Sequence, residues 1–141
     1  PREERAPSSH RDWSPLRFAG RSGELFTVVG KGGLVREVLI PSVLAGELER
    51  RRVEPRRVVD RGVNYESVYA VPGGMPWSRE FGRVSRRLLG WSTGAHGLRH
   101  SYAQLRLMEL LRAGYTYSVA LGIVAQELGH FRPDITKEYL R

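Results

Sequence analysis

The sequence predicts an α+β fold that is mainly helical and carries a small antiparallel β-sheet. Two β-branched runs, residues 25–29 and 35–40, flank the glycine-rich segment 30–33, a pattern typical of a β-hairpin. In the last third, apolar side chains recur every three or four residues, which indicates amphipathic helices. At 141 residues the chain is long enough for one core and short for two. We expect one domain over residues 25–141, preceded by a loosely ordered segment, residues 1–24, that belongs to the same domain and is truncated upstream.

Between the hairpin and the last third the pattern is weaker, and two helices are expected. The first covers residues 42–51, with Ser42 as its N-cap. The second covers residues 77–89, and Gly90 ends it. Residues 53–76 mix proline, glycine and charge, so we expect loops there and one short extended segment. The residues expected to face inward from the two helices are Val43, Leu44, Leu48, Phe81, Val84 and Leu88.

The last third has the strongest helical pattern. One helix is expected from His96 to Gly114, and a second from about Ser118 to a C-cap at Gly129. His130 would then emerge just past a helix end, and a short final helix would carry Tyr139. The inward positions are predicted to be Leu98, Tyr102, Leu105, Met108 and Leu111 in the first helix, and Leu121, Val124, Ala125 and Leu128 in the second.

Composition narrows the class of protein. The chain has no cysteine, so disulfides and thiolate metal sites are excluded. No apolar run approaches the roughly 18 residues of a membrane span, and the polar N-terminus is unlike a signal peptide, so we expect a cytoplasmic protein and no membrane partner. The net charge is +8, and nearly all cations are arginines, which favours a nucleic-acid partner. An arginine-rich proteome would give the same bias.

Four residues of the last third suggest chemistry on a phosphodiester. His96 and Arg99 are three positions apart, so one helical turn puts both on one side, and His130 adds a donor from a second helix end. Such donors stabilise charge that gathers on phosphorus. Tyr139 would be the nucleophile, and Lys31 on the hairpin turn could protonate the departing sugar oxygen.

Simpler interpretations stay open at this point. A helical histidine is more often a packing or surface residue than a catalyst, a tyrosine near a chain end usually packs, and the segment around Lys31 could be a flexible turn with a solvated lysine. His96, His100 and His130 could be taken as metal ligands, but without cysteine and with scattered carboxylates we do not favour zinc. The spacing of a P-loop and a serine nucleophile elbow are both missing.

Three boxes of the last third resemble those of the tyrosine recombinases, the phage-integrase family. Residues 96–103, HGLRHSYA, are similar to the family's H-x-L-R-H-[ST]-[FY]-A box. Residues 128–130, LGH, and residues 136–139, TKEY, resemble its L-G-H and T-x-x-Y boxes at the usual interval. Upstream, GKGG at residues 30–33, with Arg36 and Pro41, is similar to the family's lysine-bearing hairpin. The resemblance implies an integrase-type, DNA breaking-rejoining catalytic domain.

The resemblance also implies a role for each residue. Tyr139 attacks the scissile phosphate and forms a 3′-phosphotyrosyl link, Arg99 clamps the phosphate, and Lys31 protonates the 5′-oxygen. His96 assists as acid or base, and His130 hydrogen-bonds the phosphate. Family members need no metal or other cofactor, and they recombine or integrate double-stranded DNA of mobile elements as homo-tetramers. A nucleoid-associated protein of bacterial or phage origin is likewise what the resemblance implies.

The sequence departs from the family pattern in two places. Nothing in residues 1–23 matches the R-x-[ST]-E-type box that carries another clamping arginine, and the interval between Arg99 and His130 is several residues longer than usual. We therefore expect residues 1–141 alone to be weakly active or inactive. The alternatives are a degenerate, non-catalytic DNA-binding module on the same fold, a basic RNA-associated protein, and a type IB topoisomerase relative.

Overall fold

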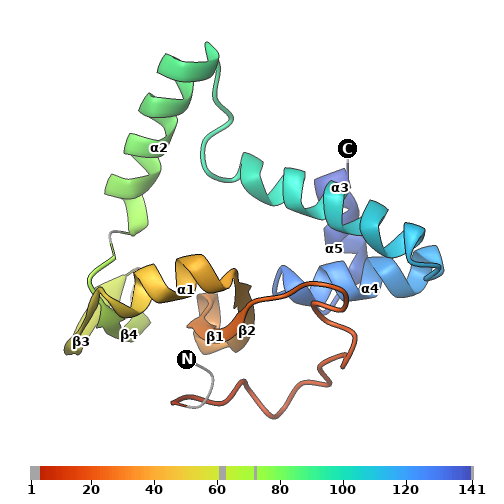
Figure 1. Cartoon of the computed structure of the whole chain (residues 1–141), viewed down its shortest axis with the longest axis horizontal. Coiled ribbons are helices and arrows are strands. Elements are labelled where there is room, and N and C mark those ends of the chain that lie inside the picture. The colour runs from red at the N-terminus through yellow and green to blue at the C-terminus, as the bar shows by residue number, and fades with distance from the viewer. Residues whose placement is uncertain (1–3, 61–62, 72, 141) are drawn as a thin grey trace. The chain divides into compact units, whose positions relative to one another are not determined.

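The structure, a computed structural model, describes residues 4–60, 63–71 and 73–140, and the side chains at positions 31, 60 and 63 are outside the description. Within these ranges the protein is mixed α+β, with five α-helices and two small antiparallel sheets of two strands each (Figure 1). The α+β class and the antiparallel pairing are confirmed, whereas the expectation of a single sheet is wrong. The chain divides into two compact units, unit 1 being Pro1–Trp13 with Phe18–Pro72, and unit 2 Ser14–Arg17 with Gly73–Arg141.

Unit 1 contains the predicted glycine-rich hairpin. Strand β1 (Glu24–Val29) pairs antiparallel with β2 (Val35–Ile40), and Phe26, which lies opposite Val38, is buried. The connection is a short 3-10 turn, η1 (Lys31–Gly33), in which Gly32 and Gly33 have φ values of 77° and 81°. Those left-handed backbone angles suit glycine, so the GKGG segment closes the hairpin without strain.

The chain before β1 is bonded to this hairpin although it forms no regular element. Ser8 donates its backbone N–H to the carbonyl of Val35 at 2.9 Å, and its hydroxyl accepts from the N–H of Val35 at 3.0 Å. Arg5 donates to both the hydroxyl and the carbonyl of Thr27, at 3.1 and 3.0 Å. Residues 4–8 therefore extend the hydrogen bonding of both strands of the hairpin.

Helix α1 (Ser42–Glu49) lies where it was predicted, but its cap and its inward face differ. Its N-cap is Pro41, and no side chain bonds the cap, so Ser42 is the first helical residue and not the N-cap. Val43 and Leu44 are 80% and 57% exposed, and the buried residue is Ala45. The predicted inward face is therefore wrong at Val43 and Leu44.

The expectation of loops over residues 53–76 is wrong. The structure forms a second hairpin there, in which β3 (Arg52–Asp60) pairs antiparallel with β4 (Val63–Tyr69). Pro55 argued against a strand because proline cannot donate to the ladder. The register shifts between Arg52 and Arg56, so Pro55 lies in the irregular part of the strand, where a missing N–H costs little.

Unit 2 is helical, and its core lies between two helices of the last third. Helix α4 (Tyr117–Glu127) begins at a Thr116 cap and buries Leu121, Val124 and Ala125, as predicted; Leu128, the C-cap, is buried as well. The other elements of unit 2 are α2 (Gly74–Leu89), α3 (Gly97–Arg112), α5 (Pro133–Lys137) and the 3-10 turn η2 (Glu138–Leu140). The buried core cluster consists of Ala103, Leu110, Ala120, Ile123, Val124 and Leu128.

The predicted inward stripes of α2 and α3 are wrong at most positions, although Tyr102 is partly buried and packs against the core cluster. In α3 the buried residues are Ala103, Arg106 and Leu110, whereas Leu98 and Leu105 are 52% and 55% exposed. The true face is about one residue out of register with the predicted one, because an arginine occupies it. In α2 the apolar stripe exists at helical spacing, but Val84 and Leu88 on it are exposed. Spacing shows that a helix face is apolar and says nothing about whether another element covers it.

Candidate functional site

The first turn of α3 brings three polar side chains to one side of the helix. His96 is the N-cap, and Arg99 and His100 follow three and four residues later. Gly97 follows His96 directly, and a Cβ at that position would overlap the hydroxyl of Thr93. The close approach of Thr93 to the backbone therefore favours glycine at this position.

The end of α4 supplies the facing part of the site. The N–H of Gly129 donates to the carbonyl of Gln126 at 2.9 Å, and the N–H of His130 donates to the carbonyl of Ala125 at 2.8 Å. This pair of bonds is a Schellman motif, and its left-handed residue is Gly129, with φ of 85°. The motif turns the chain sharply, so the carbonyl of Leu128 and the side chain of His130 leave the helix end in fixed directions.

Arg99 joins the two helix ends. Its Nη2 donates to the carbonyl of Leu128 at 2.6 Å and lies 3.2 Å from Nε2 of His130. For that second contact to be a hydrogen bond, Nε2 must accept, which requires neutral imidazole protonated on Nδ1. The Nε of Arg99 is buried and has no hydrogen-bond partner among the described residues. A buried guanidinium donor without a partner is suited to an anionic oxygen.

The ring of Tyr139 lies among three imidazoles and one guanidinium. It is half-buried on η2, and the distance from its centroid to that of an imidazole is 5.3 Å for His96, 4.9 Å for His100 and 5.7 Å for His130. The guanidinium carbon of Arg99 lies 5.6 Å from the same centroid, within cation–π range. The structure thus brings together four of the five predicted residues: His96, Arg99, His130 and Tyr139.

The fifth predicted residue, Lys31, belongs to unit 1. Its backbone forms the turn η1 between the paired strands, as expected for the tip of the hairpin. Its side chain is outside the described part of the chain, and its participation in the site stays a prediction.

His100 is a site residue to which sequence reasoning gave no role in phosphate chemistry. Its ring is the nearest of the three imidazoles to Tyr139 and also contacts His96 at 5.6 Å between centroids. The signal was present in the sequence, because a residue four positions after His96 lies on the same helix face. We considered it as a metal ligand, but the described residues contain no group of three His, Cys, Asp or Glu side chains arranged to hold a metal ion.

A buried ion pair joins the two helices that carry the site. Arg106 of α3 and Glu127 of α4 are 2% and 4% exposed, and Nε of Arg106 lies 3.1 Å from the Glu127 carboxylate. The hydroxyl of Tyr102 donates to the same carboxylate at 2.7 Å. Because Glu127 immediately precedes Leu128, this network ties the end of α4 to the helix that carries Arg99. Sequence reasoning missed it because charged residues are normally assigned to the surface.

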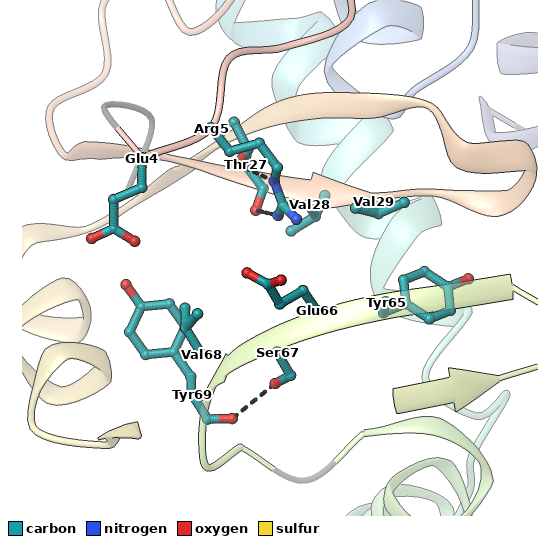
Figure 2. Close-up of a pocket in the computed structure, with 10 residues that line it drawn as sticks. All are labelled: Glu4, Arg5, Thr27, Val28, Val29, Tyr65, Glu66, Ser67, Val68 and Tyr69. Carbon is teal, nitrogen blue, oxygen red and sulfur yellow. Dashed lines mark hydrogen bonds between the residues drawn. The ribbon is translucent and has the colours of Figure 1, made fainter. Parts of the chain in front are cut away.

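A cavity in unit 1 involves other residues. A cavity of about 380 Å³ lies between β1 and β4, and Figure 2 shows Glu4, Arg5, Glu66 and Tyr69 around it. The hydroxyl of Tyr69 donates to Glu49 at 2.5 Å, and burial followed by this bond raises the pKa of Tyr69. The hydrogen bond from Arg52, followed by that from Tyr69, lowers the pKa of Glu49. None of the four predicted site residues with a described side chain, His96, Arg99, His130 and Tyr139, lines this cavity.

Comparison of the chain with protein-family models, with curated protein sequences and with solved structures found no match. Among the described residues, no helix combines the length and the apolarity needed to cross a lipid bilayer.

Proposed function

We propose that this chain is the catalytic region of a DNA strand-cleaving and rejoining enzyme of the tyrosine recombinase type. The observation that carries the proposal is the grouping of a tyrosine ring with three imidazoles and one guanidinium at the meeting point of α3, the end of α4 and η2. Three of the four sequence boxes that resemble the family contain these residues, and the fourth box contains Lys31. The net charge of +8 is consistent with a polyanionic substrate such as double-stranded DNA.

In the proposed reaction the phenolic oxygen of Tyr139 attacks the scissile phosphorus. A bond forms between that oxygen and phosphorus, the bond from phosphorus to the 5′-oxygen breaks, and the phenolic proton passes to a base, for which His96 is assigned. Arg99 and His130 would donate to the non-bridging oxygens, and Nε of Arg99 is a buried donor without a hydrogen-bond partner among the described residues. Each such donor contributes about 10²–10³ in rate at comparable sites. Reversal of the step rejoins the strand, so no metal or high-energy cofactor is required.

The role of Lys31 rests on the resemblance. We assign it the protonation of the 5′-oxygen as that group leaves, which completes the proton balance of the cleavage step. Assembly as a homo-tetramer on DNA is likewise an expectation carried by the resemblance. The second candidate function is DNA binding without cleavage, and it predicts retention of duplex DNA without a covalent product.

Trapping of a covalent complex tests the proposal. The substrate is a pool of randomised duplexes with a nick near each potential cleavage point, so that the small cleaved fragment diffuses away and rejoining fails. The test uses the full-length protein that carries this region, because residues 1–141 alone are expected to be weakly active or inactive. It should form an adduct that survives denaturation, and Tyr139→Phe should abolish it. Tyr117→Phe is the matched control, because that tyrosine is 51% exposed at the start of α4 and lies outside the site. An adduct that persists in Tyr139→Phe would remove Tyr139 from its assigned role.

A further inference from the structure

We propose that His100 is a positioning residue for Tyr139, holding the phenol ring by direct ring contact. The consequence for cleavage rests on the proposed function, whereas the contact itself does not. Of the three imidazoles around Tyr139, that of His100 is the nearest, at 4.9 Å between centroids and a tilt of 52°. Tilted and offset ring pairs at 4.5–7 Å are the favourable arrangements for aromatic side chains.

The surroundings of the two rings show why His100 can hold the ring of Tyr139. His100 lies in the first full turn of α3, whose following residues Ala103 and Arg106 are buried, so its backbone is fixed by the core. Tyr139 lies on a turn of three residues, η2, which has little regular structure of its own. The direction of the Tyr139 ring therefore depends on the side chains that contact it.

His100 also connects Tyr139 to a second site residue. Its ring makes an edge contact with His96, at 5.6 Å and 77° between planes. His100 is half-buried, whereas His96 is exposed. The more enclosed imidazole thus contacts both groups to which the proposed reaction assigns the nucleophile and the base.

Nitration of Tyr139 by tetranitromethane tests the contact without any DNA. Tryptic peptide 138–141 contains a single tyrosine, so mass spectrometry reads Tyr139 separately from the other tyrosines. His100→Ala should raise its nitration rate about three- to tenfold, and His100→Phe, which keeps a ring, should stay within about twofold of the natural protein. His10→Ala, in unit 1, should leave the rate unchanged. A nitration rate in His100→Ala equal to that in His10→Ala would overturn the proposal. A nitration rate in His100→Phe as high as the raised rate in His100→Ala would also overturn it.

The same variants then enter the covalent trapping assay. His100→Ala should form the adduct about three- to tenfold more slowly while binding duplex DNA as before, and His100→Phe should restore the rate. A His100→Phe protein as slow as His100→Ala would overturn ring packing as the role. If the natural protein forms no adduct, the proposed function fails, and the nitration rates still decide whether His100 positions Tyr139. Thermal unfolding of each variant verifies that the fold is retained.

Discussion

At the scale of single residues, Arg99 determines the geometry of the site. One nitrogen of its guanidinium contacts both the Leu128 carbonyl and His130, while Nε is buried and has no hydrogen-bond partner in the part of the chain that the structure describes. A guanidinium can bond the protein and a phosphate at once because its donors point in several fixed directions. Lysine has the same charge and three donors, but all three leave one nitrogen, so it lacks the planar fork whose separated nitrogens reach the protein and a phosphate in fixed directions.

Arg99→Lys should therefore lower the rate of covalent trapping by about 10²–10³-fold, the effect of losing an aligned donor. Charge is kept, so binding of duplex DNA should change little. Arg112→Lys, at the exposed last turn of the same helix, is the matched control and should behave as the natural protein. Equal adduct rates in the two variants would show that Arg99 contributes only charge.

Glu127 is the residue whose loss should cost most stability. It is buried against Arg106, so its replacement leaves a buried cation with an incomplete set of partners. Glu127→Gln should lower the free energy of unfolding by about 3–5 kcal/mol. Glu109→Gln removes the other carboxylate that contacts Arg106, but that side chain is 47% exposed, and the loss should stay within about 1 kcal/mol. Urea unfolding measures both, and equal losses would contradict the buried-pair account.

At the scale of elements, the ends of helices were easier to predict than their buried faces. Gly90, Gly114 and Gly129 all have positive φ, and each follows the last turn of a helix as the sequence indicated. Glycine carries this information locally, because other residues rarely adopt left-handed angles. A buried face depends on the neighbouring element, which is why the α3 stripe was misplaced around Arg106 and the β3 strand was missed at Pro55.

Two glycines of the last third provide a matched test of the helix end. Gly129→Ala should lower the free energy of unfolding by about 1–2 kcal/mol, because alanine disfavours the left-handed backbone that the Schellman motif needs. Gly122→Ala, inside α4 with open space around the new methyl group, should raise it by about 0.5–1 kcal/mol. Hydrogen exchange at the His130 amide should accelerate in Gly129→Ala alone. Unchanged exchange there would contradict the role given to the motif.

At the scale of the whole molecule, the sequence predicted which residues gather, and the structure supplies the reason for four of them. The meeting of His96, Arg99, His130 and Tyr139 follows from helix spacing, two glycine-ended helices and the short turn that carries the tyrosine. The sequence could not predict that His100 is the imidazole nearest to Tyr139, or that Arg106 and Glu127 form a buried ion pair. Both features depend on how α3 and α4 pack. The assignment of Lys31 belongs to unit 1 and rests on the resemblance.

The site of covalent attachment tests the central claim most directly. After trapping on nicked duplex DNA, nuclease and trypsin digestion should leave a nucleotide on peptide 138–141, linked through Tyr139. Tandem mass spectrometry should find the same modification in Tyr117→Phe and none in Tyr139→Phe. A nucleotide attached to another residue, or folded protein that binds duplex DNA and carries no nucleotide, would contradict the assignment of Tyr139 as the nucleophile.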